Sequence, residues 1–176
     1  MYYFIRFIKK TLRYLLKPLS FLPAIAMMVL IYHLSGQNGV QSSGLSLKVS
    51  KYLVLIYNKI CMKHLDNSTL NVLINYIHPY VRKLAHVTEY MLLAMSVSLP
   101  MYVYRMRGFF MTLLAGAFCV MFAVVDEWHQ SFVVGRVADY HDVLIDSAGI
   151  LIGLIIIRIV CVIGRKTIFH WLVLDE

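Results

Sequence analysis

Long apolar runs with very few charges constrain this chain more than any other feature of its sequence. Between Lys17 and Lys48 there is no Asp, Glu, Lys or Arg. The runs cover residues 19–34, 84–104, 109–125 and 143–163. A helix needs about 20 mostly apolar residues to cross a bilayer, and a helix satisfies all of its backbone groups internally. The sequence therefore predicts an all-α, polytopic membrane protein with four transmembrane helices.

Composition favours one membrane-embedded domain over residues 1–176. The chain is 60% hydrophobic, and 15% of its residues are charged, against roughly 25% in an average soluble domain. Its length is that of a single domain. The cysteines Cys61, Cys119 and Cys161 show no metal-ligand spacing, and the last two lie in apolar runs, so these two are expected to be buried thiols.

Residues 1–17 are expected to form a basic amphipathic helix at the membrane surface. Basic side chains fall on one helical face and apolar ones on another, with Arg6, Lys9, Lys10, Arg13 and Lys17 against Ile5, Ile8, Leu12 and Leu15. A helix of this kind binds anionic lipid headgroups through its basic face. A plain cytoplasmic extension of the first span is an equal alternative.

The distribution of Lys and Arg predicts which ends of the spans face the cytoplasm. Basic residues occur before the first span, between the second and third at Arg105 and Arg107, and after the fourth at Arg165 and Lys166. Because basic loops stay on the cytoplasmic side, the N- and C-termini are expected in the cytoplasm and residues 35–83 outside.

The outer connection, residues 35–83, is expected to contain two short helices. Apolar residues recur there at helical spacing, first as Val49, Tyr52, Leu53, Ile56 and Ile60, and then as Leu70, Leu73, Ile74 and Ile77. Helices of this kind either lie on the outer membrane surface or pack over the bundle.

Charged side chains gather where the second, third and fourth spans reach the outer face. Six of the nine acidic residues lie there, namely Glu89, Asp126, Glu127, Asp139, Asp142 and Asp146. On the second span, Arg82, His86 and Glu89 are spaced i, i+4, i+7, so they share one helical face. Three fixed positive charges, Arg82, Lys83 and Arg136, stand against these six carboxylates. The imbalance calls for protonated carboxyls, a bound cation or a wetter rim, since an unpaired charge near hydrocarbon is costly.

The acidic residues that enter the fourth span continue into a pair of glycines. Asp139, Asp142 and Asp146 step by three or four residues, and Gly149 and Gly153 follow at the same spacing. A Gly-x-x-x-Gly pair lets membrane helices approach closely. We therefore expect this face of the span to pack against the bundle and not against lipid.

Together these patterns predict one outward-facing site. Its ligand-binding residues are expected to be Arg82, Lys83, His86, Glu89, Tyr90, Asp126, Glu127, Gln130, Arg136, Asp139, Asp142 and Asp146. Ionisable residues inside a membrane domain point to function by default. The structural alternative is a set of salt bridges that pins three helices together without any ligand.

A family resemblance rests on several of these residues taken in order. The elements are Arg82, Lys83, His86 and Tyr90, then the run Asp126 to Gln130, then Gly135 and Arg136, and last Asp142, Val143, Asp146 and Gly149. The stretch from Arg82 to Gly153 resembles the VanZ-like family of small bacterial membrane proteins, and the serine-rich "SGQNGVQSSGLS" is similar more loosely. Val134 stands where that family often has proline, and Asp146 stands where asparagine is frequent.

This resemblance implies a multi-pass protein of the bacterial cell membrane. Members of the family are linked to reduced susceptibility to teicoplanin-type lipoglycopeptides. The expected partners are therefore membrane lipids, a cell-envelope lipid, a lipid-linked wall precursor or a lipoglycopeptide, and no nucleic acid.

Two function classes follow from the site. In the first, Arg82, Lys83 and Arg136 hold a phosphate or carboxylate of an envelope ligand, while the aspartates hold its amines or hydroxyls. In the second, a membrane enzyme uses a divalent cation, Mg²⁺ or Ca²⁺, with His86, Glu89 or Glu127 as candidate catalytic residues. Its metal ligands are expected among Asp126, Glu127, Asp139 and Asp142. Proton or cation transport fits less well, because the carboxylates gather at one face.

Overall fold

The computed structural model describes residues 17–61, 65–136 and 139–166, and every regular element in these ranges is a helix. A short 3₁₀ turn, η1 (Pro18–Phe21), leads into α2 (Leu22–Ser35), followed by α3 (Gly39–Ile60), α4 (Asn67–Val103), α5 (Gly108–Gln130) and α6 (Tyr140–Lys166). The all-α prediction is therefore confirmed. The predicted amphipathic helix over residues 1–17 falls almost entirely outside the described residues.

Three stretches within the described ranges are long and apolar enough to cross a membrane. They are Pro18–Ser35, Gly108–Gln130 and Tyr140–Ile163. They match the first, third and fourth predicted spans, so the chain is a multi-pass membrane protein. The second predicted span, residues 84–104, lies in the second half of α4, which carries His86 and Glu89 and does not reach the same apolarity.

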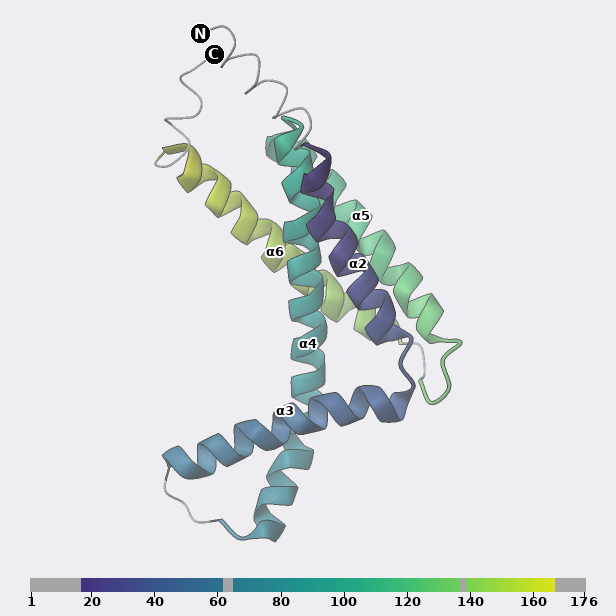
Figure 1. Cartoon of the computed structure of the whole chain (residues 1–176), viewed down its shortest axis with the longest axis vertical. Coiled ribbons are helices and arrows are strands. Elements are labelled where there is room, and N and C mark those ends of the chain that lie inside the picture. Colours follow the sequence, from purple (N-terminus) through teal and green to yellow (C-terminus); the bar gives the residue numbers. More distant parts are fainter. Residues whose placement is uncertain (1–16, 62–64, 137–138, 167–176) are drawn as a thin grey trace, which may run out of the picture.

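The central element is α4, which contacts α2, α3, α5 and α6. Figure 1 shows α2 and α5 beside the second half of α4 and α6 crossing it obliquely, while the first half of α4 projects beyond them and α3 lies across it. The helix has 37 residues, which at about 1.5 Å per residue gives roughly 55 Å, well beyond a hydrocarbon core of about 30 Å. Only part of α4 can therefore lie in a bilayer.

The core lies where the second half of α4 meets the other helices. Tyr90, Leu93, Ala94 and Val97 of α4 are buried together with residues of α2, α5 and α6, namely Ala24, Ile31, Ala115, Cys119, Ala123, Ile150 and Leu154. Of the cysteines expected to be buried, Cys119 is fully buried and Cys161 is only partly covered.

The outer connection differs from its prediction in one respect. Its first helix exists as α3, but its second is not a separate short helix, because α4 runs from Asn67 to Val103 without a break. Pro79 lies inside α4 and cannot donate to the carbonyl of Asn75. Both residues are exposed, so water can satisfy the freed carbonyl and the helix continues.

The predicted packing of Gly149 and Gly153 is confirmed. A Cβ atom on Gly149 would lie 2.3 Å from the backbone oxygen of Val87, and one on Gly153 would lie 2.4 Å from that of Met91. Real Cβ contacts are never this short, so α6 and α4 touch backbone to backbone. This crossing turns Asp146, one turn before Gly149, toward α4.

A second close contact fixes the loop between α5 and α6. Gly135 has a φ of +80°, a conformation that costs glycine little. The amide of Gly39 donates to the carbonyl oxygen of Val134 at 3.3 Å, and a Cβ on Gly39 would lie 2.4 Å from the oxygen of Gly135. The start of α3 thereby sets the position of Arg136.

Candidate functional site

The buried carboxylate of Asp126, on α5, forms the centre of a network that joins three helices. Its Oδ2 accepts hydrogen bonds from Ser35 Oγ at 2.8 Å, Tyr90 Oη at 3.1 Å and Gln130 Nε2 at 3.0 Å. The side chain is 5% exposed. With three donors on one oxygen, this carboxylate is well satisfied and ties α2 and α4 to the end of α5.

Arg136 continues this network from the loop after α5. Its Nη1 donates to Gln130 Oε1 at 2.6 Å, and its Nη2 donates to the backbone oxygen of Leu34 at 3.2 Å. Its Nε is buried and has no hydrogen-bond partner among the described residues. Burial, together with the positive charge of Arg82, lowers the pKa of Arg136 from its usual value. The guanidinium remains charged, because even a lowered arginine pKa lies far above neutral pH.

The carboxylate of Asp146, on α6, is far less well satisfied than that of Asp126. It is 3% exposed, and its Oδ1 has no hydrogen-bond partner in the described part of the chain. The nearest titratable nitrogen is His86 Nδ1, 3.8 Å away, and this nitrogen also lies 3.9 Å from Glu89 Oε2. His86 therefore stands between two carboxylates without a close hydrogen bond to either.

The remaining acidic residues lie around the entry to α6. Glu127 is buried, and its Oε1 accepts from the backbone amide of Asp139 at 2.7 Å. Asp139 itself is exposed and accepts from the backbone amide of His141 at 3.0 Å. This bond and the ring of His141 lower the pKa of Asp139. Asp142 is half-buried, and its charge reaches both His86 and Glu127.

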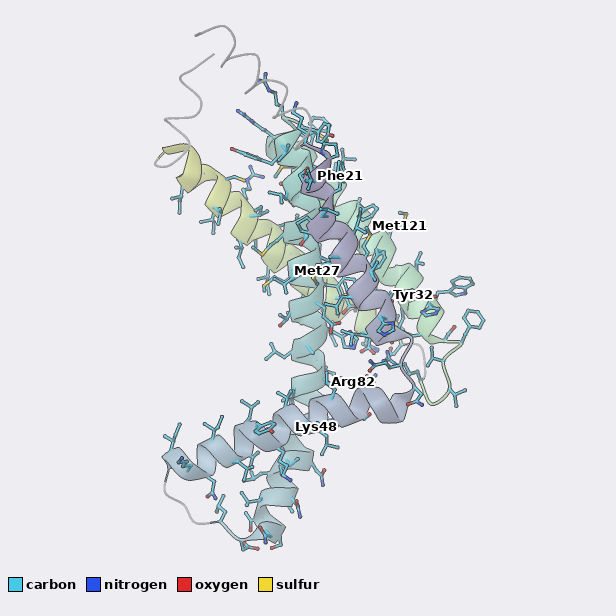
Figure 2. The ribbon with its side chains drawn as sticks, in the orientation of Figure 1. Phe21, Met27, Tyr32, Lys48, Arg82 and Met121 are labelled. Atoms are coloured by element: carbon cyan, nitrogen blue, oxygen red, sulfur yellow. The ribbon has the colours of Figure 1, made fainter. Side chains whose placement is uncertain are left out.

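A cavity of about 410 Å³ lies between α2, α3 and α4 beside this network. Its polar lining includes Ser35, Gln37, Ser42, Ser46, Arg82, His86, Glu89 and Arg136, and its apolar lining includes Met27, Leu30, Leu34, Leu45, Val49, Leu53 and Leu92. Figure 2 shows Arg82 on α4 near the crossing with α3, and Met27 further along α2. The lining of the cavity therefore combines charged and hydroxyl-bearing side chains with apolar ones.

Comparison with protein families identifies the family of this chain. A model of the VanZ/LLP1 family matches residues 20–161, most of the chain. The chain belongs to the VanZ/LLP1 family. No curated protein and no solved structure matches it. The resemblance inferred from Arg82 to Gly153 is thus confirmed, and the VanZ/LLP1 match also takes in α2 and α3.

This VanZ/LLP1 protein brings most of the twelve predicted site residues together. Arg82, His86, Glu89 and Arg136 line the cavity, while Tyr90, Asp126 and Gln130 form the network behind it. Glu127, Asp142 and Asp146 lie behind the same face of the bundle, within electrostatic reach of one another. Lys83 and Asp139 are exposed and line neither the cavity nor the network.

The predicted metal ligands do not form a cluster. Among the described residues, no three His, Cys, Asp or Glu side chains are placed to hold one metal ion. Asp126 is occupied by its three donors, and Asp139 turns to His141, while Glu127 accepts from a backbone amide. Metal binding stays a prediction that the side-chain placement does not support.

Sequence reasoning missed the contribution of α2 and α3 to the site. Ser35 donates to Asp126, the backbone of Leu34 holds Arg136, and Ser42 and Ser46 line the cavity. Three of these residues belong to the stretch "SGQNGVQSSGLS". Its serines were the available signal, because small hydroxyl side chains let membrane helices approach and hydrogen-bond.

Proposed function

We propose that this VanZ/LLP1 protein binds the anionic headgroup of a cell-envelope lipid or lipid-linked wall precursor at the outer face of the membrane. Through this binding it contributes to resistance to teicoplanin-type lipoglycopeptides. The observation that carries the proposal is the cavity between α2, α3 and α4, whose lining combines charged and hydroxyl-bearing side chains with apolar ones. A lipid likewise combines a charged headgroup with apolar chains.

The polar lining suits a phosphate or carboxylate. Arg82 and Arg136 both belong to it, and their fixed positive charges are joined by the hydroxyls of Ser42 and Ser46. Guanidinium groups bind such anions with two parallel hydrogen bonds. Arg136 keeps a buried Nε without a partner among the described residues, so a donor remains for a ligand. Glu89 and His86 also belong to the polar lining and suit an amine or hydroxyl of the headgroup.

Part of the apolar lining is exposed on the protein surface. Leu30, Leu45, Val49, Leu53 and Leu92 all line the cavity, yet each is exposed on the protein surface. Lipid chains are as apolar as these side chains, so an acyl chain can lie along them without exposing polar groups to hydrocarbon, and the affinity then depends on the headgroup. The exposed apolar lining suits a ligand that enters sideways from the bilayer.

The site faces outward only if the second half of α4 crosses the membrane as a fourth span. Arg105 and Arg107 follow α4, and their charge favours the cytoplasm for that end. The opposite end, with Arg82 and the cavity, then faces outward, and both termini lie in the cytoplasm. Helix α3 lies across this outer end (Figure 1), where exposed Tyr52, Ile56 and neighbouring lysines suit a membrane surface.

Lipid binding by variants of two adjacent basic residues tests the proposal. Arg82 lines the cavity, whereas Lys83 is exposed and does not, so Arg82→Gln and Lys83→Gln are matched charge deletions. In neutral micelles doped with phosphatidylglycerol, we expect Arg82→Gln to weaken binding by roughly tenfold, as loss of one charge-assisted hydrogen bond predicts, and Lys83→Gln to leave it unchanged. Equal loss in both variants would mean general attraction to a basic protein and would end the proposal.

Resistance and topology give a second test. Expressed in a susceptible bacterium, the Arg82→Gln variant should lose protection against teicoplanin at unchanged membrane levels, while Lys83→Gln keeps it.

Thiol labelling tests the topology. In a variant with Cys61 replaced by serine, a cysteine at the exposed Val134 should react with an impermeant thiol reagent in intact cells. A cysteine at Arg107 should not react. The reverse labelling would place the cavity inside and exclude an envelope ligand.

A further inference from the structure

A second cavity, of about 760 Å³, lies at the junction of α2 and α3 and has no role in the function proposed above. Its polar side chains are Tyr32, His33, Gln37, Lys48 and His129. Among the described residues that line it, none is acidic. This contrasts with the first cavity, where Glu89 accompanies the two arginines. The second cavity therefore offers hydrogen-bond donors and positive charge without a competing carboxylate.

The side chains of this second cavity are arranged around His129. Its ring stacks on that of Tyr32, with centroids 4.8 Å apart and an interplanar angle of 20°. Its Nδ1 is buried and has no hydrogen-bond partner within the described ranges. A buried polar nitrogen without a partner costs free energy, which a bound ligand can recover. Lys48 brings an ammonium group from α3 to the same space.

The two cavities adjoin. Gln37 and Leu45 line both of them, so the connection between α2 and α3 forms a shared wall. A headgroup that extends from Arg82 and Arg136 past Gln37 would enter the second cavity, which Lys48 and His129 line. The first cavity has the more apolar lining and the second the more polar one. A lipid bound across both would therefore place its chains at the first cavity and the far end of its headgroup in the second.

We propose that the two cavities bind one lipid with an extended headgroup that carries a second anionic group. The first anionic group, next to the chains, lies at Arg82 and Arg136, and the second, a phosphate or carboxylate further along the headgroup, lies between Lys48 and His129. This inference rests on the proposed function and specifies its ligand class. A cation is disfavoured in the second cavity, because Lys48 would repel it and no lining carboxylate would hold it.

Two probes that differ only at the far end of the headgroup test this. Phosphatidylinositol has one phosphate next to its chains, and its monophosphate carries another on the inositol ring. With the full-length protein in neutral micelles at fixed ionic strength, we expect the monophosphate to bind roughly tenfold more tightly. Lys48→Gln should remove this preference and leave affinity for phosphatidylinositol unchanged. Lys51→Gln, also on α3 and exposed but lining neither cavity, should keep the preference.

The outcomes separate this inference from the function on which it rests. If both probes bind equally to the unmodified protein and Arg82→Gln weakens both, the second anionic site is wrong and the lipid-binding function stands. If neither probe binds, both proposals fail. If the soluble inositol bisphosphate headgroup binds as tightly as the lipid monophosphate, the ligand is a soluble anion and the lipid is excluded. Loss of the preference in Lys51→Gln as well would show general charge attraction and would also overturn the second site.

Discussion

Asp126 on α5 and Asp146 on α6 are both buried beside α4, yet their carboxylates have very different surroundings. Asp126 accepts three hydrogen bonds on one oxygen, from two other helices and its own. Asp146 has an oxygen without any hydrogen-bond partner among the described residues and a histidine nitrogen 3.8 Å away. The two carboxyl groups are therefore about equally buried, but only that of Asp126 has its hydrogen-bonding capacity satisfied. We infer that Asp126 holds the structure, whereas Asp146 keeps a carboxyl group that no close donor holds and that can respond to a ligand near His86.

The cause of this difference lies in the donors that each helix contact supplies. On the Asp126 side, α2 ends at Ser35, whose hydroxyl donates to the carboxylate, and the side chains of Tyr90 and Gln130 supply two further donors. On the Asp146 side, Gly149 brings α6 against the backbone of Val87, whose groups are already used within α4. Close packing of two continuous helices leaves few spare donors, and an aspartate placed there remains unsatisfied.

The largest expected effect is on the Asp126 side. Asp126→Ala leaves the buried hydroxyls of Ser35 and Tyr90 without an acceptor, so we expect it to cost about 3–5 kcal/mol of stability, as when one partner of a buried polar pair is removed. Asp146→Ala removes an unsatisfied group and should change stability by less than about 1 kcal/mol. Unfolding of both variants in detergent measures this. Equal losses would contradict the comparison.

An intermediate effect is expected where α6 crosses α4. Gly149→Ala places a Cβ 2.3 Å from the Val87 oxygen, so α6 must move, at a cost of about 1–3 kcal/mol. Gly44→Ala, in α3, meets nothing within 4 Å and should stabilise by up to about 1 kcal/mol through helix propensity. Thermal unfolding of the pair should show opposite signs. A neutral Gly149→Ala would mean that the helices separate easily, and that Asp146 is not held in place.

The smallest effect concerns Asp66, which accepts more hydrogen bonds than Asp126 but is exposed. As the N-cap of α4 it accepts from the amides and hydroxyls of Ser68 and Thr69, and the two hydroxyls are the main cause of its pKa being lowered to about 2. Because the folded pKa lies below the unfolded value of about 3.9, its contribution is present above that value and is lost as pH falls through about 2.

We therefore expect Asp66→Asn to lower the melting temperature slightly near neutral pH. The difference from the unmodified protein should shrink as pH falls below about 4, where the carboxyl of the unfolded chain begins to bind its proton while that of the folded protein stays ionised. Solvent weakens interactions at an exposed site, so this change should be the smallest of the three. A loss comparable with that of Asp126→Ala would show that the number of hydrogen bonds, and not burial, decides the outcome.

Local pattern predicted much of this molecule, because spans and helix faces depend on nearby residues. The apolar runs predicted all three candidate spans of the described residues. The spacing of Arg82, His86 and Glu89 predicted that these side chains share a face, and all of them line one cavity. The spacing of Gly149 and Gly153 predicted the α6 crossing. Each of these depends on residues within a few turns of one helix.

Long-range contacts were not predictable in the same way. Ser35 and Asp126 are 91 residues apart, and only the packing of α2 against α5 brings them together. The continuity of α4 through Pro79 depends on the exposure of Asn75, which the sequence does not reveal. The second cavity likewise requires α3 to lie across α4 beside α2. The site residues were therefore found on α4, α5 and α6, while those of α2 and α3 were missed.

The exposed apolar lining of the first cavity has a kinetic consequence. A ligand that enters sideways through Leu30, Leu45 and Val49 never leaves the bilayer, so its search is two-dimensional. Confinement to the plane gives a minor lipid a high effective concentration at the opening. Weak, rapidly reversible binding is then sufficient for substantial occupancy. Because binding is rapidly reversible, the occupied fraction of the cavity would rise and fall with the concentration of that lipid. The protein would then act as a sensor of membrane composition.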